Sequence, residues 1–260
     1  MGDLPSVAQM RPVTQPPTVT GRPSAEHWTG TLYMRRISPY VTRLLLRTRI
    51  TPNGVTGLMI LAGAAAGVAL LLEGLPGAVL AVLCVQLQML LDCSDGELAR
   101  WRGRFSARGV FLDKLGHYTA EALIPLALGV RADGGIDSIG GWTTLGALLS
   151  VLVLLNKSLN DMVHVARARA GLAPLADSPD VGTPRRASVR RLRSMARFVP
   201  FHRAYHSVEL TFLALLGAIC DLALGSDLTA TRVLVLGLLV AAVVTVAGHV
   251  AAILTSSKLR

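Results

Sequence analysis

The chain has 260 residues, of which 52% are apolar and only 16% are charged, yet its formal net charge is +10. Soluble domains carry about 25% charged residues and a smaller apolar share, so this composition excludes a disordered chain and argues against an ordinary soluble enzyme. A basic soluble protein would suggest nucleic acid as a partner, whereas a basic and strongly apolar chain indicates a membrane protein with charged loops. We therefore expect no nucleic-acid partner. The three cysteines are too few for a disulfide or zinc framework.

Residues 1–26 are rich in proline and threonine and lack the apolar core of a secretory signal, which predicts a disordered cytoplasmic tail. Residues 27–50 place apolar side chains such as Trp28 and Tyr33 at roughly helical spacing between arginines. This amphipathic pattern predicts an interfacial helix on the inner leaflet, bent near Pro39. A disordered basic segment is the alternative for these residues.

Six apolar stretches follow, each close to the ~20 residues with which a helix crosses ~30 Å of hydrocarbon. They cover residues 54–72, 77–95, 110–130, 141–163, 208–224 and 232–254. Arginine and lysine gather in every second connection, while the alternate connections hold only Arg131 and Arg232. The positive-inside rule then predicts an all-α integral membrane bundle of six transmembrane helices with both termini in the cytoplasm, most simply at the plasma membrane.

Two smaller features accompany the predicted spans. A cytoplasmic loop at about 165–206 is rich in arginine and serine, and a short amphipathic helix is expected in it around 186–198. Gly63 and Gly67 in the first span form a small-residue pattern that lets helices approach closely. That pattern fits either packing within the chain or a dimer seam.

Three carboxylates lie at the cytoplasmic ends of two predicted spans. Asp92 and Asp95 end the second span on one helix face, since they are three residues apart, and Asp113 begins the third. Charged side chains within spans are costly and usually functional. Clustered carboxylates repel one another and suit a hard divalent cation, Mg²⁺ or Mn²⁺. The alternative is that each carboxylate pairs with an arginine of the following loop.

The spacing around these carboxylates is specific. It is Asp92-x2-Asp95-Gly96-x2-Ala99-Arg100-x8-Gly109-x3-Asp113-x3-His117. This pattern resembles the signature of the CDP-alcohol phosphatidyltransferases, D-x2-D-G-x2-A-R-x8-G-x3-D-x3-D, and matches seven of its eight fixed positions. The resemblance extends over residues 27–260, to the six-span plan, the interfacial helix and the Thr51-Pro52-Asn53 entry to the first span. It leaves the N-terminal tail outside.

The resemblance implies an enzyme of phospholipid synthesis that transfers a phosphatidyl or related phospho-alcohol group from a CDP-alcohol to a hydroxyl acceptor and releases CMP. The expected donor is CDP-diacylglycerol, with other CDP-alcohols left open, and the expected assembly is a homodimer. Asp92, Asp95 and Asp113 would bind Mg²⁺ or Mn²⁺ on the cytoplasmic side. The residues implied in CDP binding are Asn53, Asp92, Gly96, Ala99, Arg100 and Gly109.

The eighth motif position is His117, where the family has an aspartate proposed as the general base. Imidazole is well suited to abstract a proton near neutral pH, so we expect His117 to be the catalytic base. Glu121 follows on the same helix stripe and would orient its ring. Two alternatives stay open: a pseudoenzyme that binds CDP-lipid without turnover, and a structural histidine beside another base.

The acceptor side is marked by two basic residues. Lys157 lies in a polar stretch of the fourth predicted span, and Arg203 opens the fifth. In family members with a phosphorylated acceptor, basic residues near these helices bind its phosphate, so the resemblance implies Lys157 and Arg203 as acceptor ligands and favours a polyol or sugar phosphate. Snorkelling toward the headgroups is the alternative. A small transporter is a third class of function, disfavoured because the acids gather at one boundary and no repeat is visible.

Overall fold

The computed structural model describes residues 4–20, 28–173, 204–256 and 259. The helices before the first apolar stretch are α1 (Val7–Thr14), α2 (Pro17–Thr20), the π-helix η1 (Gly30–Met34) and α3 (Arg35–Leu45). They are followed by α4 (Pro52–Leu70), α5 (Gly74–Arg102), α6 (Ala107–Asp133), the 3-10 helix η2 (Ile136–Ser138), α7 (Gly141–Arg169), α9 (Ser207–Leu224) and α10 (Thr229–Thr255). The described part of the chain contains no strand, so the predicted all-α class is confirmed.

Within the described residues, five helices are long and apolar enough to cross a membrane, namely α4, α5, α7, α9 and α10. The chain is therefore a multi-pass membrane protein, as predicted. The third predicted span lies in α6, which has 27 residues but interrupts its apolar run with charged residues such as Asp113, Glu121 and Arg131. The total of six spans thus stays a prediction.

The chain divides into two compact units. The first consists of residues 1–66 and 83–120, which include the N-terminal helices and the whole Asp92–His117 motif. The second consists of residues 67–82 and 121–260, which include α7, α9 and α10. The helices α4, α5 and α6 each contribute residues to both units. Each of the three therefore makes contacts within both units.

The N-terminal segment differs from the disordered tail predicted over residues 1–26. α1 begins with a capping box, in which the Ser6 hydroxyl accepts from the Gln9 N–H (3.2 Å) and the Gln9 side chain accepts from the Ser6 N–H (2.8 Å). Met10 and Thr14 are fully buried. The composition concealed this order because the segment is held by residues far along the chain, including Arg43, whose Nε donates to the Pro5 carbonyl.

The helix predicted over residues 27–50 is present as η1 and α3, with Pro39 inside α3. Its exposed side chains are largely apolar, for example Ile37 and Tyr40, whereas the polar Ser38 is fully buried. This reversal of the usual distribution fits a helix whose outer face meets lipid. Its location at a membrane surface stays a prediction, and the helix expected around 186–198 lies outside the described residues.

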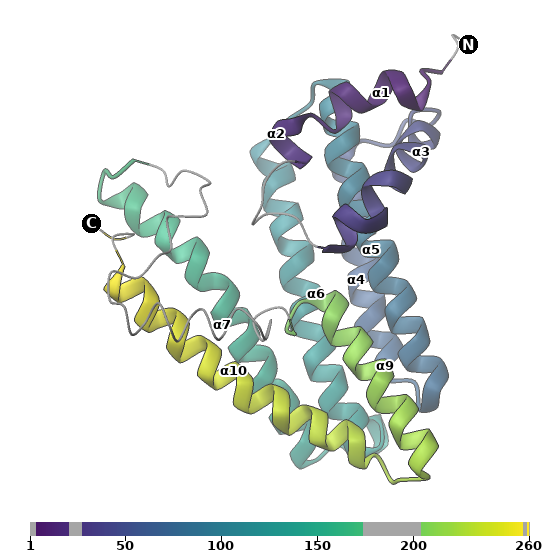
Figure 1. Cartoon of the computed structure of the whole chain (residues 1–260), viewed down its shortest axis with the longest axis vertical. Coiled ribbons are helices and arrows are strands. Elements are labelled where there is room, and N and C mark those ends of the chain that lie inside the picture. Colours follow the sequence, from purple (N-terminus) through teal and green to yellow (C-terminus); the bar gives the residue numbers. More distant parts are fainter. Residues whose placement is uncertain (1–3, 21–27, 174–203, 257–258, 260) are drawn as a thin grey trace. The chain divides into compact units, whose positions relative to one another are not determined.

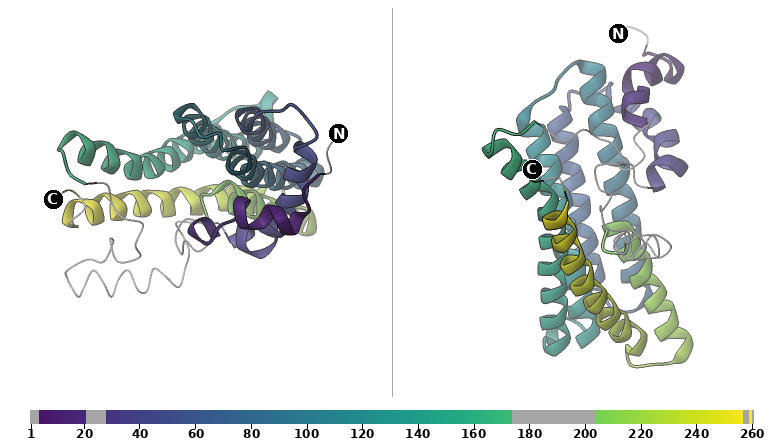
Figure 2. Two further views of the ribbon diagram at one scale, coloured as in Figure 1. Left: turned by 90° about the horizontal axis from the view of Figure 1, so that it is seen from above. Right: turned by 60° about the vertical axis from the view of Figure 1, so that its left-hand side comes forward.

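In the second unit, α7 and α10 run side by side, and α10 also packs against α9 (Figures 1 and 2). The Asp221 carboxylate of α9 accepts from the N–H groups of Ala230 (2.7 Å) and Thr231 (3.1 Å) in the first turn of α10. These N–H groups have no partner within their own helix. The carboxylate therefore fixes where α10 begins after the short connection.

Small residues let helices approach closely at several points within the chain. A Cβ atom on Gly63 would lie 3.1 Å from the Cβ of Ala120, and one on Gly67 would lie 2.7 Å from the Cβ of Leu123. Both glycines of the predicted small-residue pattern thus face α6 of the same chain. Of the two readings left open by the sequence, the structure shows packing within the chain.

The closest helix crossing gives a prediction about stability. A Cβ on Gly146 of α7 would lie 2.7 Å from Gly129 Cα and 2.8 Å from the Pro125 carbonyl oxygen of α6. Because these are backbone atoms, they cannot rotate away, and we expect Gly146→Ala to lower the free energy of unfolding by about 1–3 kcal/mol. Thermal unfolding in detergent measures this, with Gly237→Ala as control, since a Cβ there meets nothing within 4 Å. Equal melting temperatures of the two variants would contradict the prediction.

Candidate active site

The first half of the motif lies on the C-terminal part of α5. Twenty-nine residues make a helix about 44 Å long, which exceeds the ~30 Å of hydrocarbon. One end must therefore extend beyond it, and the charged end from Asp92 to Arg102 is the end that tolerates water. Asp92 and Asp95 are one turn apart on this end, so their side chains emerge from one helix face as the sequence predicts.

The chain then reverses so that α6 returns alongside the motif of α5. Gly103 takes a left-handed φ of +61° directly after α5, which glycine adopts without strain. Arg102 holds this end of α5 by donating to the carbonyls of Thr48 (3.2 Å) and Ile50. The Ser106 hydroxyl then accepts from the Gly109 N–H (3.0 Å) and caps the start of α6.

α6 also packs tightly on α4 within the same unit. A Cβ atom at Gly116 would lie 2.1 Å from Met59 Cε and 3.0 Å from Ile60 Cγ1. Met59 itself belongs to the buried apolar cluster between α4 and α5. The glycine before His117 therefore lets α6 approach closely enough to bring its carboxylate and imidazole to the face of α5.

Asp92, Asp113 and His117 meet in a cluster that joins the two halves of the motif. His117 Nε2 lies 3.1 Å from Asp92 Oδ1 and 3.6 Å from Asp113 Oδ1. One ligand atom of each residue lies within 4.8 Å of the other two, and the three side chains are between 23% and 42% exposed. Two carboxylates and an imidazole at this separation fit a divalent cation.

Asp95 lies apart from this cluster in its contacts. Its buried carboxylate accepts a hydrogen bond of 2.6 Å from the hydroxyl of Thr56 on α4, and the group of close ligand atoms found among the described residues does not include it. The role of Asp95 as a metal ligand therefore stays a prediction. Thr56 was not singled out in the sequence, although it follows Asn53 by three residues and so shares its helix face.

A cavity of 420 Å³ opens beside Asp95, a volume in the range that holds small ligands and nucleotides. Its walls include five of the six positions implied in CDP binding, which are Asn53, Gly96, Ala99, Arg100 and Gly109. The sixth, Asp92, is one helical turn from Asp95. The structure thus brings together, in one hollow, residues that span more than 50 positions of the sequence.

The two motif glycines make room for neighbouring side chains of this cavity. A Cβ on Gly96 would lie 3.2 Å from one terminal nitrogen of Arg100, and a Cβ on Gly109 would lie 3.1 Å from Asn53 Oδ1. The absence of a side chain at Gly96 therefore lets the guanidinium of Arg100 lie across the helix surface. From the sequence, both glycines were expected only as positions implied in CDP binding.

In the second unit, Glu121 makes contacts that the sequence did not suggest. Its Oε1 lies 2.7 Å from Lys157 Nζ and 3.6 Å from His206 Nδ1, and the glutamate side chain is only 6% exposed. Glu121 thus forms an ion pair with Lys157, the predicted acceptor ligand. Its predicted role in orienting His117 stays a prediction. The other acceptor candidate, Arg203, lies outside the described residues.

Comparison with protein families agrees with this geometry. The family model of the CDP-alcohol phosphatidyltransferases matches residues 49–173, which include the Asp92–His117 motif, every wall of the 420 Å³ cavity and Lys157. Residues 49–173 therefore form a CDP-alcohol phosphatidyltransferase domain, the domain of a family of transferases. Members of the family generally depend on divalent metal ions, which agrees with the cluster of Asp92, Asp113 and His117. No curated protein matches the chain.

Proposed function

We propose that the protein transfers a phosphatidyl group from CDP-diacylglycerol, or the corresponding group of another CDP-alcohol, to a polyol or sugar phosphate and releases CMP. The observation that carries this proposal is the cluster of Asp92, Asp113 and His117, one helical turn from a cavity lined by the motif residues. The proposed setting is the plasma membrane, with both termini and the active site on the cytoplasmic side, because arginine is concentrated in the corresponding loops.

In this proposal, the motif residues around the cavity each contribute to binding of the donor. Mg²⁺ or Mn²⁺ bound by Asp92, Asp95 and Asp113 would neutralise the diphosphate and stabilise the leaving CMP. Arg100 would pair with a phosphate oxygen through its guanidinium. Ala99 and the two motif glycines keep the wall low enough for the nucleotide to approach the backbone, and Asn53 offers its amide from α4.

His117 would accept the proton of the attacking hydroxyl. The acceptor oxygen forms a bond to the phosphorus that carries the lipid alcohol, while the bond from that phosphorus to the bridging oxygen breaks and CMP leaves with the electron pair. The hydroxyl proton passes to the imidazole. Asp92 and Asp113 face Nε2 of His117, so they supply the neighbouring negative charge that stabilises the protonated ring. The sequence had assigned that support to Glu121.

Glu121 would instead hold the acceptor ligand Lys157 in place. An ammonium fixed by a buried carboxylate loses less freedom when it binds a phosphate, and a buried glutamate needs such a partner. Asn156 is held similarly, since its Oδ1 lies 2.9 Å from His249 Nδ1. Arg203 is proposed as the second basic ligand of the acceptor.

We expect Lys157→Met to raise the KM for a phosphorylated acceptor by about tenfold or more, because a charge-assisted contact with phosphate is lost, while the KM for the CDP donor changes little. Steady-state kinetics with each substrate varied in turn measure the two constants. Ser158→Ala is the matched control, because this hydroxyl only bonds the Leu155 carbonyl of its own helix. An unchanged acceptor KM in Lys157→Met would contradict the assignment.

Release of CMP by the purified protein tests the proposed function as a whole. Labelled CDP-diacylglycerol is incubated with inositol phosphate, glycerol phosphate, serine or a free polyol, with Mg²⁺, with Mn²⁺ or with a chelator. Release that needs both a metal ion and one acceptor supports the proposal. Binding of the donor without release for any acceptor would favour a pseudoenzyme, and failure to bind any CDP-alcohol would contradict both.

The resemblance also leads us to propose a homodimer. Gly63 and Gly67 are occupied by contacts with α6 of the same chain, so the seam would use another face. Light scattering of the protein in detergent, corrected for the bound detergent, measures the mass of the assembly.

A further inference from the structure

The N-terminal segment of residues 4–20 is bound to the motif-bearing end of α5. It precedes the family domain of residues 49–173 and was expected to be disordered. At its start, the Pro5 carbonyl accepts from Arg43 Nε (2.9 Å). Near its middle, Met10 is fully buried, and at its end Gln15 bonds α3 and α5 together.

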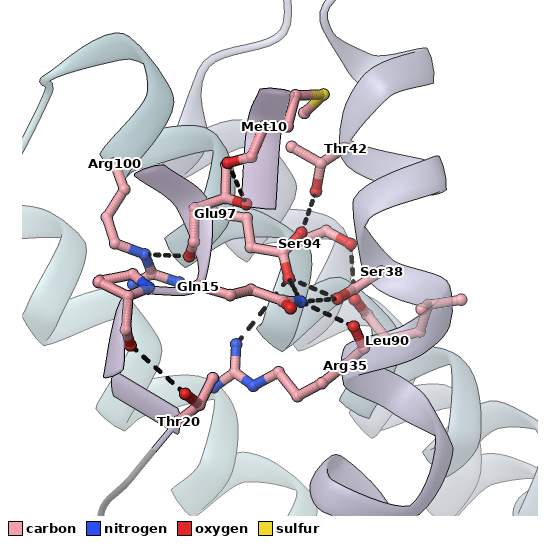
Figure 3. Close-up of polar contacts among 12 residues, drawn as sticks. Met10, Gln15, Thr20, Arg35, Ser38, Thr42, Leu90, Ser94, Glu97 and Arg100 are labelled. Atoms are coloured by element: carbon pink, nitrogen blue, oxygen red, sulfur yellow. Dashed lines mark hydrogen bonds and ion pairs between the residues drawn. The ribbon is translucent and has the colours of Figure 1, made fainter. Parts of the chain in front are cut away.

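Glu97 is the centre of this attachment (Figure 3). It is fully buried, two residues after Asp95, and its Oε1 accepts from the Gln15 side-chain amide (2.7 Å) and from the Ser38 hydroxyl. Its Oε2 accepts from the Thr42 hydroxyl (2.7 Å). A buried carboxylate is costly unless its oxygens are bonded, so Glu97 of α5 holds together its donors from the end of α1 and from α3.

The same Gln15 amide also donates to the Arg35 carbonyl at 2.8 Å. One side chain therefore connects the end of α1, the interfacial helix α3 and the buried carboxylate of α5. Among the described residues of the segment, only Gln15 bonds both α3 and Glu97 through its side chain. Replacement of Gln15 therefore removes the side-chain link of the segment to Glu97 and leaves the Thr42–Glu97 bond in place.

Thr14, next to Gln15, contacts the predicted nucleotide site directly. Its main-chain carbonyl accepts from Arg100 Nε at 2.6 Å. As the last residue of α1, Thr14 presents a carbonyl that lacks a partner within its helix, at the negative end of the helix dipole. With Nε bound there, the terminal nitrogens of Arg100 lie over Gly96, 3.2 and 3.4 Å from the position of a Cβ atom, on the wall of the cavity.

We propose that residues 4–20 are a positioning element of the donor site, in which Gln15 and Glu97 fix α1 so that the Thr14 carbonyl orients Arg100 toward the diphosphate of a CDP-alcohol. This inference rests on the proposed function, because it takes Arg100 as a ligand of the donor. Gln15 acts through Arg100 and does not itself touch the nucleotide. Its effect is therefore confined to donor affinity.

Binding of CDP to the full-length protein and steady-state kinetics test this role. We expect Arg100→Ala to weaken CDP binding by about ten- to a hundredfold, the loss of a charge-assisted hydrogen bond. Gln15→Ala should weaken it by about three- to tenfold and raise the KM for the donor by the same factor, with the acceptor KM unchanged. Gln15→Ala combined with Arg100→Ala should bind CDP no more weakly than Arg100→Ala alone, because the two residues act through one contact.

Val13→Ala is the matched control, since this side chain of α1 is exposed. A melting temperature close to that of the unchanged protein establishes that Gln15→Ala is folded.

Four outcomes would overturn the proposal. The positioning role fails if Gln15→Ala binds CDP as tightly as Val13→Ala does. It also fails if the loss of CDP affinity in Gln15→Ala adds to the loss in Arg100→Ala when the two are combined. It also fails if removal of residues 1–20 tightens CDP binding, because the segment would then oppose the donor. An unchanged affinity in Arg100→Ala would remove Arg100 from the donor site, and so contradict that part of the proposed function, which the other three outcomes leave intact.

Discussion

Replacement of His117 by alanine is expected to lower the kcat of transfer by about 10²- to 10⁴-fold, the contribution usual for a positioned general base. The affinity for CDP should change little, because His117 is not among the residues that line the cavity. The reason lies in the geometry, since Nε2 of the ring faces both Asp92 and Asp113. CMP release measures the rate, and equilibrium binding of CDP measures the affinity.

Two further variants sharpen this result. His117→Asp restores the residue of the family motif and should retain part of the activity, since a carboxylate can also accept the proton. His164→Ala is the matched control, because this histidine of α7 is exposed and lies in the other unit. Full activity of His117→Ala would exclude the imidazole as base. If His117→Ala lost Mn²⁺ binding as well as turnover, the result would identify His117 as a metal ligand and not as the base.

Asp92→Asn should abolish metal-dependent transfer, with a loss of at least about a hundredfold, because loss of a ligating carboxylate weakens metal binding at least as much as loss of its supporting partners. Asparagine keeps the size of the side chain but removes the charge that faces His117. A titration of CMP release with Mn²⁺ measures the effect as a raised metal requirement. Asp113→Asn should behave in the same way.

An exposed aspartate provides the control for these variants. Asp137 of η2 is exposed, so Asp137→Asn should leave the Mn²⁺ requirement unchanged. The same titration on Asp95→Asn tests whether Asp95, bonded to Thr56, also binds the ion. A normal metal requirement in both Asp92→Asn and Asp113→Asn would contradict the proposed metal site.

Much of the site could be predicted because its residues are close in the sequence. Asp92 and Asp95 are one helical turn apart, as are Asp113 and His117, so helix geometry alone places each pair on one face. The short connection from Arg102 to Ala107 then forces α6 to return beside α5. The meeting of Asp92 with His117 follows from these local constraints.

The prediction of a disordered tail was wrong for α1 and α2, because their contacts are with residues distant in the sequence. Composition reports how much apolar surface a segment can bury, and residues 1–26 have little. Composition does not reveal that Gln15 donates a hydrogen bond to the buried carboxylate of Glu97, which lies 82 residues further along the chain. The order of this segment depends on that long-range bond and on the burial of Met10.

The sequence by itself determined the all-α membrane class and the motif face, because the length of an apolar run and the 3.6-residue period of a helix are local properties. Only the tertiary structure decided which partners the buried charges take. Glu97 bonds Gln15, Asp95 bonds Thr56, and Glu121 pairs with Lys157. Each of these contacts joins different helices or segments, so it depends on how they pack and leaves no periodic signal in the chain.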